Sequence, residues 1–401
     1  MKAGLVVSLR SYPAAAWLDR GDARERSIRH RVNVAWGLLF FNTMTYTDGS
    51  VLHLPASVGK GLAQAALPLA VFVLLTVNPQ IKIRPNAFLC LVGLLVMETV
   101  LTAVETHHLD SIFLTLRFAG YVGALWLLTP WWGRSDMMLL RIHLRWVYVA
   151  LGLAALGTLI SPGKAFAFDG RLQGVLWPMT ATQVGQYAAV AVGLTVLLWL
   201  GHQLSGRLSL AGIAIAMVLL LLTHTRTALV GLVAGMVMAG LSVVAVNTRV
   251  RKFFAVFVGI LSIAAMTAGS FIATWLERGE NQQGLLSLTG RTNFWSLVLH
   301  EPRNTFQEIF GFGLSNAGIN GSPIDSNWLA AYQMEGYFGD VVCGMMLVFL
   351  LASALFQSPG IRRALGLFII SYCMVAAFTE DALADVSTYL LHLVAAASLL
   401  G

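Results

Sequence analysis

Residues 208–246 read LSLAGIAIAMVLLLLTHTRTALVGLVAGMVMAGLSVVAV, and Arg226 is the one charged residue among them. Two apolar runs flank the turn THTRT at 223–227, and each run approaches the ~20 residues with which a helix crosses a bilayer. The stretch therefore predicts a transmembrane hairpin with an arginine at its turn. A charged side chain at such a position costs free energy, so a charge found there usually has a function. Arg226 and the neighbouring His224 are therefore candidate functional residues.

The rest of the chain repeats this pattern. Its 401 residues are 57% hydrophobic and 11% charged, whereas soluble proteins average about 25% charged residues. This composition excludes secreted enzymes and nucleic-acid-binding proteins, and it predicts an all-α polytopic membrane protein with about twelve transmembrane helices. The predicted spans are 33–48, 57–77, 86–104, 112–129, 144–161, 182–200, 208–223, 227–246, 253–275, 328–356, 364–378 and 385–400.

Four regions follow from these spans. Residues 1–31 form a basic cytoplasmic tail, and residues 32–275 contain the first nine transmembrane helices. Residues 276–327 form an extracytoplasmic loop with short helices, and residues 328–401 contain the last three spans. With the N-terminus in the cytoplasm, about two thirds of the Lys and Arg residues fall on the cytoplasmic side, as the positive-inside rule requires. An even number of spans then places both termini in the cytoplasm.

The basic residues that break this rule lie on the outer side. Lys60, Arg171, Arg226 and Arg291 are the ones that we take as candidate ligands. Arginine suits bidentate contacts to phosphate. The anion that resides at a membrane surface and carries a substrate is a lipid phosphate or pyrophosphate, so the sequence predicts a binding site for such a group on the outer face.

A metal could hold the same anion, but it would need clustered carboxylates. Glu380 and Asp381, with Asp385 four residues later, form the one acidic cluster on the predicted outer side. The sequence therefore favours an arginine-based site without metal or cofactor.

A transporter or a lipid-carrier flippase is an alternative from another class. Transporters place ionisable groups near the middle of the membrane, and Glu98 lies inside a predicted span with Arg117 as a possible partner. A flippase would need a cationic cavity that opens to both sides, whereas the candidate arginines lie toward the outer side.

Three short stretches contain the candidate arginines in recognisable settings. Residues 168–174 read FDGRLQG, which contains Arg-x-x-Gly, and residues 225–229 read TRTAL at the start of a predicted helix. Residues 289–291 read TGR, and Trp295 follows in a Gly-Arg-x-x-x-Trp spacing.

A fourth stretch runs from GFG at 311–313 through DSN at 325–327 to EGYFG at 335–339. In this order, the four stretches resemble the O-antigen ligase and O-antigen polymerase superfamily of polytopic membrane glycosyltransferases. The resemblance covers about residues 165–340, and the first five spans are similar to the family only in hydropathy.

The resemblance implies a fold of the glycosyltransferase C type (class B), with the active site on the outer side of the bacterial plasma (inner) membrane. It implies a polyprenyl (undecaprenyl) pyrophosphate-linked oligosaccharide as donor, a glycan or glycolipid as acceptor, and no metal. Arg226 and Arg291 correspond to the family's pyrophosphate ligands, and Arg171 to a loop arginine. Lys60 is a further candidate donor ligand.

The stretch at 325–327 departs from the family at one position. Ligases usually have His before Asn, whereas this chain has Ser326 there and Asp325 before it. Asp325 is therefore either the general base for the acceptor hydroxyl or a helix N-cap. The missing His favours a polymerase over a ligase, and Asn327 and Glu335 are further candidates at this site.

Overall fold

The structure is a computed structural model of the chain. It describes residues 14–44, 50–52, 54–167, 169–244, 248–267, 291–316, 318–319, 322–380 and 383–400.

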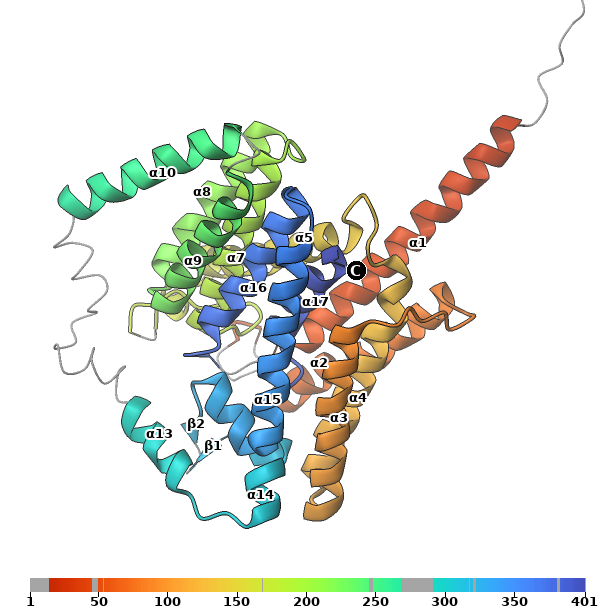
Figure 1. The fold of residues 1–401 in the computed structure, drawn as a ribbon, viewed down its shortest axis with the longest axis vertical. Helices are drawn as coiled ribbons and strands as arrows, with labels where there is room; N and C mark the ends of the chain where they lie inside the picture. The colour runs from red at the N-terminus through yellow and green to blue at the C-terminus, as the bar shows by residue number, and fades with distance from the viewer. Residues whose placement is uncertain are drawn as a thin grey trace, which may run out of the picture.

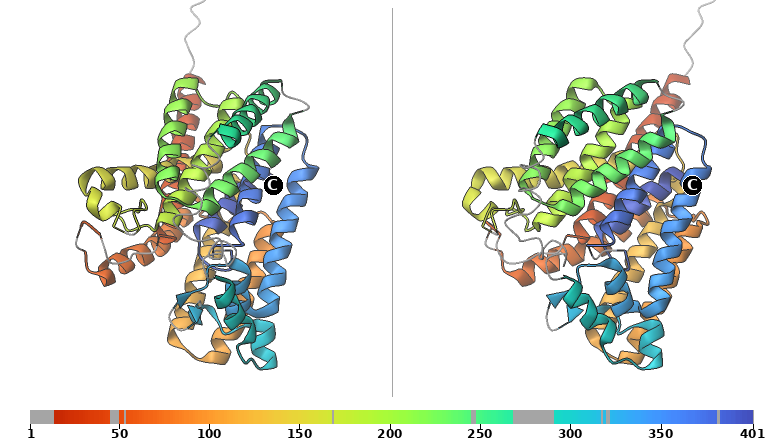
Figure 2. Two further views of the ribbon diagram at one scale, coloured as in Figure 1. Left: turned by 90° about the vertical axis from the view of Figure 1, so that its left-hand side faces the viewer. Right: turned by 60° about the vertical axis from the view of Figure 1, so that its left-hand side comes forward.

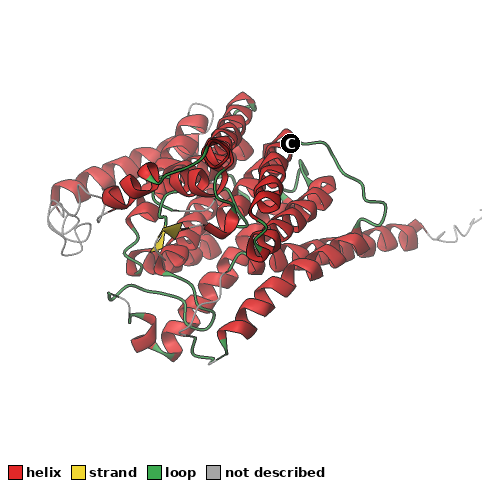
Figure 3. Cartoon of the chain, turned by 90° about the horizontal axis from the view of Figure 1, so that it is seen from below, coloured by secondary structure: helices red, strands yellow, loops and turns green. Residues whose placement is uncertain are grey.

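Helices make up most of the described chain, as Figure 1 shows. One antiparallel pair of two-residue strands, β1 (Gly318–Ile319) and β2 (Ser322–Pro323), lies among them (Figure 3). The helices are α1 (Ala14–Asn42), α2 (Ala56–Val77), α3 (Ala87–Thr106), α4 (Leu109–Leu128), η1 (Thr129–Trp131), α5 (Met138–Ile160), α6 (Pro162–Ala165), α7 (Ala181–Leu200), α8 (Gly206–Leu222), α9 (Arg226–Val243), α10 (Thr248–Thr267), α13 (Arg291–His300), α14 (Thr305–Phe310), η2 (Leu314–Asn316), α15 (Asn327–Phe356), α16 (Ile361–Ala376) and α17 (Thr388–Leu400).

A helix lies in each of the twelve predicted spans, but the helices differ in length and polarity. Among the described residues, seven helices are long and apolar enough to cross a membrane: α2, α3, α4 continued by η1, α5, α7, α9 and α15. Helices α8 and α17 are apolar but shorter, with 17 and 13 residues. The all-α class is confirmed and the long apolar helices fit a multi-pass membrane protein, while the count of twelve crossings stays a prediction.

Helix α7 is the centre of the bundle. Within its apolar window, 89% of the residues are buried inside the protein, and α5, α8, α9 and α16 pack against it. It begins with a capping box, in which the Thr180 hydroxyl accepts from the Gln183 N–H and the Gln183 side chain accepts from the Thr180 N–H. This arrangement satisfies two of the backbone donors at the helix start.

The outward faces of the surrounding helices are apolar. Large side chains on these faces are more than half exposed, including Phe72, Val104, Leu116, Leu159 and Val348. Soluble monomers rarely expose so much contiguous apolar surface, so these faces are suited to contact with lipid.

Helix α17 begins deep in the bundle rather than at its end. The hydroxyl of Thr388, its first residue, is 3.2 Å from the hydroxyl of Tyr187, which is the seventh residue of α7. Thr388 also lies 3.1 Å from the Thr43 hydroxyl, just after the end of α1. The segment at 383–387 therefore lies beside the first turns of α7.

Two short helices, α13 and α14, contact α15. Figure 2 shows them at the same end of the molecule as the α3–α4 connection. The hydroxyl of Ser315 in η2 is 3.0 Å from that of Ser111 in α4, which joins the segment before α15 to the α3–α4 pair.

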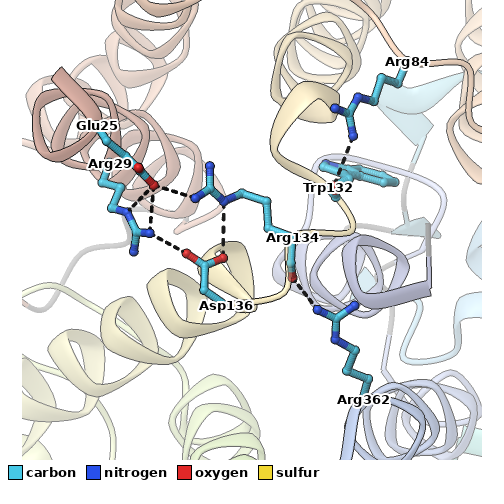
Figure 4. A network of polar contacts seen from close by, with 7 residues as sticks. All are labelled: Glu25, Arg29, Arg84, Trp132, Arg134, Asp136 and Arg362. Atoms are coloured by element: carbon cyan, nitrogen blue, oxygen red, sulfur yellow. Dashed lines mark hydrogen bonds and ion pairs between the residues drawn. The ribbon is translucent and has the colours of Figure 1, made fainter. Parts of the chain in front are cut away.

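An ion-pair network holds α1 against the loop before α5 (Figure 4). Arg134 donates to Glu25 at 2.6 Å and to Asp136 at 3.3 Å, and Arg29 reaches the same two carboxylates at 3.0 and 2.7 Å. Arg362, next to the start of α16, donates to the Arg134 carbonyl at 2.7 Å. These charges join three segments that are far apart in the sequence.

We expect this network to weaken in acid. Hydrogen bonds from Arg29 and Arg134 lower the pKa of Glu25. Burial raises the pKa of Asp136, but the hydrogen bond and charge of Arg134 outweigh it, so its pKa is also lowered. A carboxyl with a lowered folded-state pKa stabilises the fold above its unfolded pKa, near ~4, and loses this effect as the pH falls through the folded value.

The melting temperature of the purified protein should therefore fall below about pH 4, and Asp136→Asn should reduce this pH dependence. Asp110→Asn is the control, because Asp110 is exposed and makes no ion pair within the described part of the chain. An unchanged pH profile in Asp136→Asn would show that the network does not contribute to stability.

Candidate functional site

The turn between α8 and α9 places Arg226 at the first position of α9. His224 has a positive φ of 50°, which reverses the chain within three residues. Thr225 is the N-cap residue, but its side chain makes no capping bond to α9 and its hydroxyl donates to the Ala181 carbonyl at 3.2 Å. The start of α9 therefore combines a guanidinium with the positive end of the helix dipole.

Arg171 reaches the same turn from the loop that precedes α7. Its Nε donates to the Thr223 carbonyl at 3.0 Å and its Nη2 to the Thr225 hydroxyl at 3.4 Å. Next to it, the Leu172 N–H donates to the Leu222 carbonyl at 2.9 Å. The structure thus brings two of the predicted arginines, Arg171 and Arg226, to one turn, and both side chains are half-buried.

The turn also lies directly on α7. A Cβ atom at Gly185 would come within 2.9 Å of the Thr223 and Thr225 side chains, which is closer than side chains pack. A glycine at this position therefore lets the turn approach the start of α7.

The segment that follows α16 joins the beginning of α9 to the beginning of α15. The hydroxyls of Thr227 and Thr379 are 2.6 Å apart, and the Asn327 N–H donates to the Ala377 carbonyl at 3.0 Å. Asp325 lies two residues before Asn327 and is exposed. One short segment therefore contacts the start of α9 next to Arg226 and the start of α15 close to Asp325.

Asp325 lies one residue before the N-cap position of α15. Helix α15 begins at Asn327, and Ser326 takes the N-cap position with no side-chain capping bond. Asn327 itself is fully buried, and its Oδ1 accepts from the Leu383 N–H at 2.6 Å. Asn327 thus holds the segment before α17 in place, a role that its sequence position did not predict.

The sequences GFG and EGYFG contact each other at a kink in α15. The N–H groups of Phe312 and Gly313 donate to the carbonyls of Gln333 and Met334 at 2.9 and 2.8 Å. Gly336 has φ 63° and ψ −162°, so the helix changes direction there. A Cβ atom at Gly336 would lie within 2.6 Å of the backbone that precedes the GFG turn.

Glu335 lies at this kink and is fully buried. A Cβ atom at Gly339 would come within 2.7 Å of the Glu335 Oε2. The Glu-Gly-x-x-Gly spacing therefore has a physical reason, since the glycine one turn later leaves room for the carboxylate.

The remaining predicted cations are placed differently. Lys60 lies on an exposed face near the start of α2. The segment before that helix is attached to the loop of Arg171, because the Val51 N–H donates to the Val175 carbonyl at 2.8 Å. Arg291 is the first residue of α13, and its side chain lies outside the described residues, so its approach to Arg226 stays a prediction.

Arg303 is a residue whose position the sequence did not predict. Its side chain is 5% exposed and donates to the Tyr332 carbonyl at 2.9 Å and to the Gln333 Oε1 at 2.6 Å. Its guanidinium also lies 4.0 Å from the centre of the Tyr332 ring. Arg303 therefore attaches the loop between α13 and α14 to α15. The sequence around Arg303, with Glu301 two residues before it, contains no pattern that predicts this contact.

The expected pair between Glu98 and Arg117 is not formed. Arg117 donates to the Asn42 carbonyl at 2.7 Å and lies with Asp385 at a small cavity. Glu98 is 1% exposed, and its carboxylate oxygens have no hydrogen-bond partner within the part of the chain that the structure describes.

We expect Gly336→Ala to destabilise the protein by roughly 1–3 kcal/mol, because alanine does not tolerate this conformation and its methyl group meets backbone. Thermal unfolding of the purified protein measures the effect. Gly344→Ala is the matched control in the same helix, since nothing lies within 4 Å of a Cβ there. Equal melting temperatures for the two variants would contradict the kink as described.

Comparison with known proteins finds no family model that matches the chain and no curated protein that is similar to it.

Proposed function

We propose that the chain is a membrane glycosyltransferase. It uses a polyprenyl-pyrophosphate-linked glycan as donor and polymerises or transfers surface polysaccharide on the outer side of the bacterial plasma membrane. The observation that carries this proposal is the convergence of Arg171 and Arg226 at the start of α9.

This arrangement suits a diphosphate better than other ligands. The helix start supplies backbone N–H groups and a positive dipole end, which bind phosphate in many proteins. Arg226 adds a group whose geometry matches phosphate oxygens. The surrounding helices are apolar outside, so a ligand that is itself a lipid can reach the turn from the membrane.

In the proposed reaction, an acceptor hydroxyl attacks the anomeric carbon of the donor sugar. The new glycosidic bond forms as the bond to the pyrophosphate oxygen breaks, with inversion, and polyprenyl pyrophosphate leaves with the electron pair. Arg226, together with Arg171 and Arg291, stabilises the developing negative charge. Asp325, exposed at the start of α15, takes the hydroxyl proton.

A purified-protein assay distinguishes the alternatives within this function. The substrate is a polyprenyl-pyrophosphate oligosaccharide, and the products are resolved by size. A ladder of longer lipid-linked glycans without a second acceptor identifies a polymerase, which we favour. Transfer only after a separate glycolipid acceptor is added identifies a ligase, and the absence of any lipid release contradicts the proposal.

Arg226→Ala should lower the rate of transfer by about 10²–10³-fold, the usual effect of losing one group that stabilises transition-state charge. Arg207→Gln is the control, because Arg207 is an exposed arginine at the other end of the α8–α9 hairpin. The rate is measured by release of polyprenyl pyrophosphate. If Arg226→Ala folds and retains the wild-type rate, Arg226 is not a donor ligand.

Asp325→Asn should lower the turnover rate by about 10²–10⁴-fold, as expected for loss of a general base. Donor binding should be unchanged, because the substitution leaves the arginines in place. Addition of EDTA should leave the wild-type rate unchanged, since arginines replace a metal in the proposed site. Loss of activity on chelation would contradict the metal-independent mechanism.

Transport is the second candidate function, and Glu98 is the observation that favours it. A carboxyl group that is buried in the middle of an apolar helix without a hydrogen-bond partner is typical of proton- or ion-coupled carriers. Under this alternative, Glu98→Gln would abolish uptake of a lipid-linked glycan into proteoliposomes. A glycosyltransferase would instead retain its transfer rate in that variant if the fold is intact.

A further inference from the structure

A groove lies between α5, α7 and α8, at the end of these helices opposite Arg226. Its volume is about 450 Å³. It is reached from the outside of the bundle between the first turns of α5 and α8. It is therefore separate from the candidate glycosyltransferase site.

The walls of the groove are apolar. Leu144, Leu198, Leu204 and Leu208 line it, and Leu208 is 77% exposed. Deeper in the groove, the hydroxyls of Tyr148 and Thr195 are 2.7 Å apart and satisfy each other. A long apolar chain fits such walls, because it would cover exposed leucine side chains without displacing a polar group.

Two arginines stand at the rim of the groove on successive turns of α5. The Arg141 Nη2 donates to the Oε1 of Gln203 at 2.7 Å, and this partner is neutral. Arg145 is exposed and makes no hydrogen bond or ion pair with the described residues. The lining residues of the groove include no carboxylate, while Asp136, which is bound to Arg29 and Arg134, lines the adjoining pocket on the other side of the two arginines.

Two neighbouring arginines at the same end of the protein are compensated, since Arg29 and Arg134 share the carboxylates of Glu25 and Asp136 (Figure 4). Arg141 and Arg145 instead lie beside an apolar channel, and neither forms an ion pair with the described residues.

We propose that the groove binds one acidic phospholipid of the surrounding membrane. Its phosphate lies between Arg141 and Arg145, and one acyl chain lies along the leucine walls. Charge complementarity selects an anionic over a zwitterionic headgroup, as in other basic pockets between transmembrane helices. A bound lipid would contact both α5 and α8. At this end of the bundle, the lipid would take the place of direct contacts between these two helices.

The test uses the full chain in nanodiscs that contain phosphatidylcholine with or without phosphatidylglycerol. Native mass spectrometry counts the lipids that the protein retains after release from the disc. We expect one tightly retained phosphatidylglycerol and no equivalent phosphatidylcholine. Arg141→Gln combined with Arg145→Gln should weaken retention by about tenfold or more, given the usual contribution of each basic residue near a membrane surface.

Arg207→Gln is the matched control, because Arg207 lies at the same end on α8 but does not line the groove. If the double variant does not fold, Arg145→Gln alone keeps the test valid, because Arg145 makes no hydrogen bond or ion pair with the described residues. It should weaken retention severalfold. Equal retention of both lipids, or the same loss in Arg207→Gln as in Arg145→Gln, would overturn the proposal.

Discussion

The hydrogen bonds from Arg171 to the α8–α9 turn are the interaction on which the candidate site depends. They attach the loop before α7 to the start of α9, and Gly185 lets the same turn lie on α7. Through Thr227 and Thr379, the turn is also joined to the segment that positions α15. Four stretches of chain thus meet at the turn, where backbone N–H groups, the positive end of a helix dipole and guanidinium groups lie close together. The proposed diphosphate would bind to this concentration of positive charge.

Arginines at one end of the bundle are used in different ways. Arg134 binds the carboxylates of Glu25 and Asp136, which hold α1 against the loop before α5. Arg145 lines a groove that has no carboxylate among its lining residues, and it is the arginine that we propose to bind a lipid phosphate. Arg303 shows a third use, in which a buried guanidinium is satisfied by a carbonyl, an amide and an aromatic ring. Counting arginines in a sequence does not distinguish these uses, because the difference lies in what other segments place beside them.

The positions of the helices could be predicted from the sequence because each depends on a local run of apolar residues. Arg171 and Arg226 were both predicted to lie on the outer face, so their proximity agrees with that expectation, but the contact between them was not itself predicted. The kink at Gly336, the burial of Glu335 and the role of Asn327 were not, since each depends on backbone from a segment distant in sequence. The exact helix ends were a second source of error: the predicted span 385–400 begins three residues before α17 does. The approach of Arg291 to Arg226 stays a prediction.

The late start of α17 has a consequence for how this helix relates to the membrane. Thr388 lies beside Tyr187, six residues into α7, which at 1.5 Å per residue is about 9 Å from the beginning of that helix. The segment that precedes α17 is held by Asn327 and is packed into the protein, since Leu383, Ala384 and Val386 are all buried. Every residue of α17 from Thr388 to Leu399 is buried as well. This short helix is therefore shielded from lipid by its neighbours and does not need the length of a helix that faces the bilayer.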